Sequence, residues 1–299
     1  MDKNTLKTSH ISFDKRALTM LPPRRQRSNK GDYGRVLCVC GCSGMSGAAY
    51  LAAKAAYRTG AGLAEVFTPE QNRIVLQTSL PEAIVMSYTD EYKKSDILPS
   101  LERADSIVIG CGIGVTPLSL VILSDLLHSV NPTLKPLVID ADAINLLSRN
   151  RSLLKYVSGA ILTPHFMEAS RLLEKPIETL LKNPEAAAYE IASKYGVICV
   201  MKDHETVISD GRANMYVNRS GNSGMATGGS GDVLSGILGG LLAQNAKSEN
   251  RLTAIETTAL GVYVHGLAGD AAAVKLGEYS LMASDIIEAL PLVLRNTNQ

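Results

Sequence analysis

A complete strand–helix–strand pattern occupies residues 35–68, which read RVLCVCGCSGMSGAAYLAAKAAYRTGAGLAEVFT. The apolar run 35–41 predicts a buried strand, and the alanine-rich stretch 47–59 predicts a helix that stops at Gly60. Residues 62–68 predict the next strand. Two strands joined by a helix run parallel in one sheet, so this stretch by itself indicates an α/β fold.

The same alternation continues through most of the chain. Further strands are predicted at residues 106–110, 136–140, 160–163, 197–201, 206–209 and 215–218, and helices at 117–130, from Asp142, at 184–195 and over the last 70 residues. The last three strands follow one another without a helix between them. We therefore expect a central, mostly parallel sheet with helices on both faces and a small antiparallel edge.

Charge is unevenly distributed along the 299 residues, although the net charge is only +1. Residues 1–35 carry nine Lys or Arg against three Asp or Glu, whereas the other 264 residues carry 21 against 26. We expect a solvated basic leader over residues 1–30 and a single α/β domain over residues 31–299, because no linker or repeat interrupts the later sequence. Aromatic residues make up only 5% of the chain and no nucleic-acid-binding motif is present, so we expect no nucleic acid partner.

The chain has neither an apolar signal core near its start nor any run of 18 apolar residues, so we expect no membrane span. Five cysteines, an odd number, favour a reducing cytoplasm. Cys38, Cys40 and Cys42 alternate along a predicted strand and so face one side of it. We interpret them as small buried hydrophobic residues, because zinc ligands usually come as CxxC pairs in turns.

The most informative motif is a glycine-rich loop that leads into a helix, TGGSGDVLSGILGG at residues 227–240. Gly228, Gly229 and Gly231 surround Ser230 and leave backbone N–H groups unshielded, and the start of a helix adds further free N–H groups. Together they form an anion site suited to phosphate. Asp232 either caps this helix or accepts a proton from a hydroxyl that attacks phosphorus, and the segment by itself leaves both open.

Other loops follow predicted strands, where α/β proteins bind ligands. Two are rich in glycine, residues 41–49 (GCSGMSGAA) and residues 110–114 (GCGIG). Asp140 and Asp142 either cap a helix or hold Mg²⁺ through water.

Two histidines stand at further informative positions. His165 ends another strand and either makes one backbone hydrogen bond or contacts a substrate. His265 lies among apolar residues in a predicted helix, and we interpret it as a satisfied helix histidine.

Taken together, these motifs resemble the ribokinase-like superfamily, and within it the ADP/ATP-dependent NAD(P)H-hydrate dehydratases. The resemblance runs from about residue 30 to 290 and rests on KGDYGR, GMSGAAYLAAKAAYRTGAGLAEVFTP, GCGIG, DADAINLL, LTPH with Glu168, VMKDHET, TGGSGDVLSG and HGLAGD. Two places depart from the family pattern. Cys40 and Cys42 stand at positions of small residues, and Phe166 and Met167 replace a Pro-Gly pair, which makes the loop after His165 bulkier.

The resemblance implies a repair enzyme that removes water from hydrated NADH or NADPH, the S-epimer of the 6-hydroxy-tetrahydro form, while ADP becomes AMP and phosphate, or ATP becomes ADP and phosphate. It also implies Mg²⁺, a homotetramer and a separate epimerase that works with the enzyme. A small-alcohol kinase of the same superfamily, acting on a hydroxymethylpyrimidine or a thiazole alcohol, is an alternative. A non-catalytic nucleotide-binding sensor is another.

The resemblance also assigns roles to individual positions. Asp232 corresponds to the catalytic base that also contacts the substrate, and Gly229, Ser230 and Gly231 to the anion hole. Glu168 corresponds to an acidic position near Mg²⁺. The nucleotide would be bound by Lys202, Asp203, His204, Glu205, Thr206 and Gly231, and the hydrated cofactor by Ala48, Gly112, Gly114 and His165.

Overall fold

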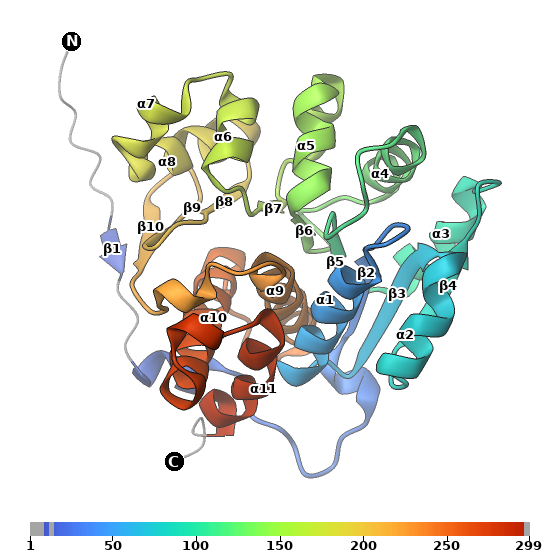
Figure 1. Ribbon diagram of the computed structural model, residues 1–299, viewed down its shortest axis with the longest axis horizontal. Helices are drawn as coiled ribbons and strands as arrows, with labels where there is room; N and C mark the ends of the chain where they lie inside the picture. Colours follow the sequence, from blue (N-terminus) through green and yellow to red (C-terminus); the bar gives the residue numbers. More distant parts are fainter. Residues whose placement is uncertain (1–8, 12–14, 296–299) are drawn as a thin grey trace.

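The computed structural model describes residues 9–11 and 15–295, and within them the chain forms one large sheet (Figure 1). Its strand order is β1-β10-β9-β8-β7-β6-β5-β2-β3-β4. The strands are β1 (Ser9–Ile11), β2 (Arg35–Val39), β3 (Leu63–Pro69), β4 (Ile84–Tyr88), β5 (Ser106–Ile109), β6 (Leu137–Ile139), β7 (Ile161–Leu162), β8 (Ile198–Met201), β9 (Thr206–Ser209) and β10 (Asn214–Asn218).

Most neighbouring strands are parallel, as expected. The pairs from β4 through β3, β2, β5, β6 and β7 to β8 are all parallel. The pairs β8–β9 and β9–β10 are antiparallel, which confirms the predicted edge, and β1 adds a parallel pair beyond β10. Because the parallel strands share one direction, their carboxyl ends and the loops that follow them lie along one edge of the sheet.

Helices cover both faces of the sheet, which confirms the prediction (Figure 1). One face packs against α3 (Lys94–Arg103), α4 (Pro117–Ser129), α5 (Ala141–Arg149), α6 (Phe166–Leu173), α7 (Ile177–Leu181) and α8 (Pro184–Tyr195). The other packs against α1 (Ser46–Arg58), α2 (Arg73–Ser79), α9 (Ser230–Lys247) and α10 (Ala254–Leu276). Helix α11 (Ala283–Leu294) lies outside α9 and α10 in a further apolar layer. Alternate residues of a strand feed opposite faces, so Leu37 joins the first core and Val36 the second.

Several helices begin or end where the sequence predicts, because the residues that mark these ends act locally. Helix α4 begins at Pro117, and the Thr116 side chain accepts a hydrogen bond from the Ser119 N–H. Helix α8 ends at Gly196, whose φ of 65° is left-handed. Three elements between β3 and β5, namely α2, β4 and α3, were not predicted from the sequence. Strand β4 is an edge strand with alternate residues exposed, so it gives no buried apolar run.

Part of the expected leader is not solvated. A 3-10 helix, η1 (Lys15–Met20), packs against the outer helices and buries Ala17 and Leu18. Residues 1–8 and 12–14 of the leader lie outside the described residues, and the division into a leader and one domain stays a prediction. No helix in the described part of the chain is long and apolar enough to cross a membrane.

The cysteine interpretation is confirmed in its main point. Cys38 and Cys40 are fully buried in the core on the α1 side of the sheet, and all five cysteines are free. Cys42 differs, because β2 ends at Val39 and leaves Cys42 half-buried in the following loop.

Candidate active site

The glycine-rich loop ends at the start of α9 with an uncapped helix terminus. Gly229 is the N-cap residue with a φ of 91°, and no side chain within the described chain makes a capping hydrogen bond there. Asp232 is the third residue of the helix, so the interpretation of Asp232 as a helix cap is wrong. Free N–H groups and the positive end of the helix dipole therefore remain available to an anion.

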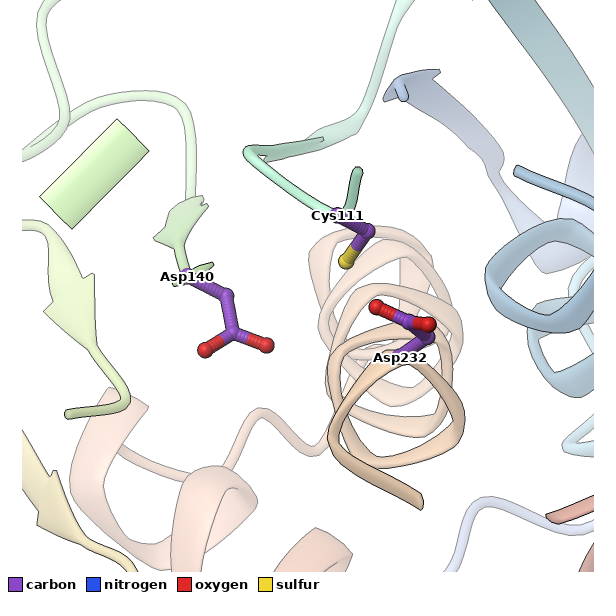
Figure 2. Close-up of side chains that lie close together, drawn as sticks. All are labelled: Cys111, Asp140 and Asp232. Atoms are coloured by element: carbon purple, nitrogen blue, oxygen red, sulfur yellow. The ribbon is translucent and has the colours of Figure 1, made fainter. Parts of the chain in front are cut away.

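Three side chains converge beside this helix start (Figure 2). Cys111 follows β5, Asp140 follows β6, and Asp232 belongs to α9. The Cys111 thiol and one carboxylate oxygen each from Asp140 and Asp232 lie within 4.8 Å of one another. Strands β5 and β6 are parallel neighbours, so their loops meet at the carboxyl edge, and α9 packs against both strands.

An ion pair organises the charges at this point. Lys202, directly after β8, donates from Nζ to Oδ1 of Asp140 at 2.6 Å, and Ser235 Oγ donates to Oδ2 at 2.8 Å. Burial of Asp140 opposes ionisation, but the Lys202 ammonium outweighs it and holds the pKa of Asp140 below its usual range. Burial likewise opposes the charge on Lys202, and the Asp140 carboxylate raises the pKa of Lys202. Both groups are therefore charged at neutral pH.

Asp232 has the opposite electrostatic environment. Burial, followed by the negative charge of Asp140, raises the pKa of Asp232 to about 6. A carboxylate with a pKa close to neutral is suited to take up a proton and release it again.

The capping alternative for Asp140 is wrong, because Asp140 stands at the N-cap of α5 but its side chain makes no capping hydrogen bond. Lys202 and Ser235 occupy its oxygens instead. Asp142 accepts a hydrogen bond from the Gly114 N–H at 2.9 Å and so ties the GCGIG loop to α5. The cluster of Cys111, Asp140 and Asp232 is a poor magnesium site, because Mg²⁺ prefers oxygen ligands to a thiol.

The predicted substrate positions lie close together: Ala48 is in the first turn of α1, and Gly112 and Gly114 are in the loop after β5. Gly112 has a φ of 61°, and a Cβ atom placed on it would lie 2.8 Å from the Cβ atom of Ala48. Gly114 has a φ of 75° and lies against the Cys42 side chain. The segment that leads into α1 follows β2, and the GCGIG loop follows β5. Because β2 and β5 are adjacent strands, the two segments lie together beside Cys111.

His165 lies across the site, next to Lys202. The Lys202 N–H donates to the Pro164 carbonyl at 2.9 Å, which holds the two loops together. His165 caps α6, and its Nδ1 accepts from the N–H groups of Met167 and Glu168. Its ring therefore makes more than the single backbone hydrogen bond weighed from the sequence. Burial, and then the charge of Lys202, lowers the pKa of His165.

Glu168 is nearly buried beside the same ion pair. Its Oε2 accepts a hydrogen bond from the His165 N–H at 2.9 Å. Burial raises the pKa of Glu168 to about 7 in spite of the nearby Lys202 charge. Its other oxygen, Oε1, lies 3.4 Å from Nε2 of His165.

The predicted nucleotide segment divides into a buried and an exposed part. Lys202 points inward to Asp140, whereas Asp203, His204 and Glu205 form the turn from β8 to β9, and Thr206 begins β9. Thr206 pairs with Asn218 at the end of β10, so this turn borders the loop that leads to α9. The structure thus brings the predicted nucleotide and phosphate segments to one edge.

Two residues of this site were not found from the sequence. His265 lies in α10 with its Nε2 3.4 Å from Oγ of Ser230, which agrees with its interpretation as a satisfied helix histidine, and this contact also turns the ring toward the glycine-rich loop. Its place in the HGLAGD motif was the available signal. Cys111 offered only its position in GCGIG, between glycines that follow a strand.

The sheet order, the glycine loop and an acidic residue in the first turn of the following helix define a ribokinase-like α/β protein. A crystal structure of a ribokinase-like superfamily protein from Enterococcus faecalis superposes with a TM-score of 0.85 and 32% identity, covering 99% of each chain. The family model described as NAD(P)H-hydrate dehydratase matches residues 36–292, and the chain belongs to this family.

Two further relatives have more specific names. The ADP-dependent (S)-NAD(P)H-hydrate dehydratase of Neisseria meningitidis is 37% identical over 83% of this chain and 80% of its own length. The ADP/ATP-dependent NAD(P)H-hydrate dehydratase of Bacillus subtilis, co-crystallised with ATP/Mg²⁺, has a TM-score of 0.78 and 26% identity, covering 95% of this chain and 98% of that one. The chain spans only about half the length of other curated relatives, which are named bifunctional NAD(P)H-hydrate repair enzymes.

Proposed function

We propose that this protein dehydrates the S-epimer of hydrated NADH or NADPH at the expense of ADP or ATP, and so restores the reduced cofactor. One observation supports this activity most directly. Asp232, with a pKa raised to about 6, stands in the first turn of α9, where the helix start is free to bind phosphate. A base beside a phosphate site is the arrangement that phosphorylation of a hydroxyl requires.

In the proposed reaction Asp232 removes the proton from the 6-hydroxyl of the hydrated ring. The oxygen attacks the terminal phosphorus of ADP or ATP, so an O–P bond forms and the bond to AMP or ADP breaks. The ring nitrogen then donates its lone pair, the C6–O bond breaks and phosphate leaves. Loss of a proton from C5 completes the double bond and yields NADH or NADPH. Phosphorylation replaces hydroxide with a much better leaving group.

Each predicted role has a place in this scheme. The backbone at Gly229, Ser230 and Gly231 would stabilise the charge on the transferred phosphoryl group. A Cβ on Gly231 would lie 3.5 Å from Nζ of Lys202, so the ammonium is close enough to add to that stabilisation. Asp203, His204, Glu205 and Thr206 would contact the nucleotide, and Ala48, Gly112, Gly114 and His165 the hydrated cofactor.

We also propose that Mg²⁺ accompanies the nucleotide, as in the co-crystallised Bacillus relative. Magnesium commonly uses one or two carboxylates together with substrate phosphates. Glu168 fits this role, because its carboxylate feels the charges of Asp140 and Lys202 and forms no salt bridge with Lys202 in the described structure. The ion would neutralise phosphate charge in the bound state.

We further propose a cytoplasmic homotetramer that works with a separate NAD(P)H-hydrate epimerase. Five free cysteines support the compartment, since thiols stay reduced there. The bifunctional repair enzymes among the relatives support the coupling to a second activity.

The deciding experiment combines ADP and ATP with hydrated NADH and hydrated NADPH in the presence of Mg²⁺. The measured signal is the return of the near-ultraviolet absorbance of the dihydronicotinamide ring, with Asp232→Asn as control. We expect turnover with at least one pair. No recovery with any pair would contradict the proposal. A stable phosphorylated product from a small alcohol would favour the kinase alternative, and tight nucleotide binding without turnover would favour the sensor.

A further inference from the structure

The HGLAGD segment at residues 265–270 has no role in the chemistry described above. It lies within α10, and His265, Gly266, Gly269 and Asp270 share one face of that helix, since residues four apart lie one turn apart. This face lies against residues 218–230, which connect β10 to the start of α9. The segment therefore contacts the loop that delivers the proposed phosphate site.

Two glycines allow the loop to lie directly on the helix. A Cβ atom on Gly266 would lie 2.1 Å from Ser220 Oγ and 2.6 Å from the Ser220 carbonyl oxygen. A Cβ atom on Gly269 would lie 2.1 Å from Sδ of Met225. A larger residue at Gly266 would displace the Ser220 backbone, whereas at Gly269 it would displace the flexible Met225 side chain.

Asp270 fixes the middle of the same loop. Its Oδ2 accepts from the Gly221 N–H at 3.0 Å, and its Oδ1 accepts from Nδ2 of Asn222 at 3.0 Å. The Asn222 Oδ1 in turn accepts from the Gly224 N–H at 3.1 Å, so its amide cannot flip without losing a bond. One carboxylate thus holds both a backbone and a side-chain donor.

His265 reaches the far end of the loop, one turn before Asp270. Its Nε2 lies 3.4 Å from Oγ of Ser230, the first residue of α9. Burial lowers the pKa of His265 to about 4, so the ring is neutral at neutral pH. A neutral ring holds Ser230 without adding a second cation beside Lys202.

We propose that His265 and Asp270 are positioning residues, which fix residues 219–229 on α10 and so orient the N–H groups at the start of α9 toward the transferred phosphoryl group. This inference rests on the proposed function, because it assigns these residues to the same phosphate site. It predicts that loosening either contact weakens nucleotide binding and slows turnover, while the fold is retained.

The test compares the single variant Asp270→Asn with a double variant that exchanges the side chains of Asp270 and Asn222. In Asp270→Asn the new amide group faces two hydrogen-bond donors, the Gly221 N–H and the Asn222 side-chain amide, and its own NH₂ group must point toward one of them. We expect kcat to fall about 10- to 100-fold and the Kd for ADP to rise. We also expect faster hydrogen exchange in residues 219–229. In the double variant Asp270→Asn with Asn222→Asp, donor and acceptor are simply exchanged. We expect this variant to recover most of kcat, ADP affinity and exchange protection. A double variant no better than Asp270→Asn would overturn the proposal.

A second pair tests His265. His265→Gln keeps a polar group near the place of Nε2 and should retain most of kcat, whereas His265→Leu should lose it with an unchanged melting temperature. Val274→Ala is the control, because Val274 lies on the same helix and is 90% exposed. Wild-type ADP affinity in Asp270→Asn and in His265→Leu would refute the proposal. ADP affinity and hydrogen exchange need no turnover, so they decide positioning even if the wild type repairs no hydrated cofactor.

Discussion

The Lys202 ammonium and the Asp140 carboxylate form an ion pair of 2.6 Å between Nζ and Oδ1, at the edge of the sheet beside Asp232, in which Asp140 is buried and Lys202 is 21% exposed. The two residues come from loops after β8 and β6, separated in the sheet by β7. The pair places a cation next to the proposed phosphate site and an anion next to the proposed base.

The first prediction concerns the strength of this pair. Lys202→Met leaves the Asp140 carboxylate buried without its cation, and we expect the free energy of unfolding to fall by about 3–5 kcal/mol. Adding Asp140→Asn removes the uncompensated charge and should restore much of the loss. Urea unfolding of both variants measures the difference. A double variant as unstable as Lys202→Met would contradict this account.

The second prediction concerns the pH dependence of turnover. Asp232 acts as a base only when ionised, so kcat should rise with pH through about 6. Asp140→Asn removes a negative charge that raises the pKa of Asp232, so the midpoint should move to lower pH. The kcat–pH profile measures the shift, and Asp125→Asn, on the distant α4, should leave the profile unchanged.

The third prediction concerns the chemical role of Asp232. Asp232→Asn removes the proposed base and should lower kcat by about 10²–10⁴-fold, while ADP still binds. Titration with ADP and single-turnover assays separate the two effects. Near-normal turnover would show that Asp232 is not the base.

The same substitution has an expected effect on stability. The pKa of Asp232 is raised from 3.8 to about 6 in the folded protein, so the folded state binds its proton more tightly than the unfolded chain does. The free energy of unfolding therefore falls as pH rises from about 4 to about 6, and the full cost persists above that. Asp232→Asn should stabilise the protein at neutral pH by on the order of 2 kcal/mol and much less at pH about 4. Thermal unfolding at both pH values checks the sign.

The fourth prediction compares two adjacent glycines. Gly229 has a φ of 91°, and a Cβ atom there would lie 2.5 Å from Cδ1 of Leu51, so Gly229→Ala should cost about 1–2 kcal/mol and displace the start of α9. Gly228 has an ordinary φ and nothing within 4 Å of a Cβ, so Gly228→Ala should change stability by less than about 0.5 kcal/mol. Equal losses in the two variants would exclude the conformational explanation.

The elements that were predicted correctly had strong local signals. Pro117 and Gly196 mark helix ends because proline and glycine restrict or free the backbone wherever they stand. The apolar residues of β2 and the alanines of α1 predict buried elements without any information from the rest of the chain. Strand β4 was missed because it is held by pairing with β3, which no local pattern records.

The sequence predicted which residues form the candidate site, but it did not predict which of them contact one another. Asp232 and the loop around Ser230 were found from their own sequence, since glycines before a helix indicate an anion site in any fold. The capping alternative for Asp140 failed, because the partner of its side chain, Lys202, lies 62 residues further along the chain.

Local patterns were enough to predict the α/β class, most of the strands and helices, and the glycine-rich loop before α9, because each depends on residues within a few positions of one another. Which charges meet could not be predicted in this way, and it became clear only from the folded chain. The tertiary structure placed Lys202 on Asp140, the Cys111 thiol beside Asp232, and Asp270 under the loop before α9. Such contacts join distant segments, and their electrostatic effect depends on burial, which only the packed fold creates.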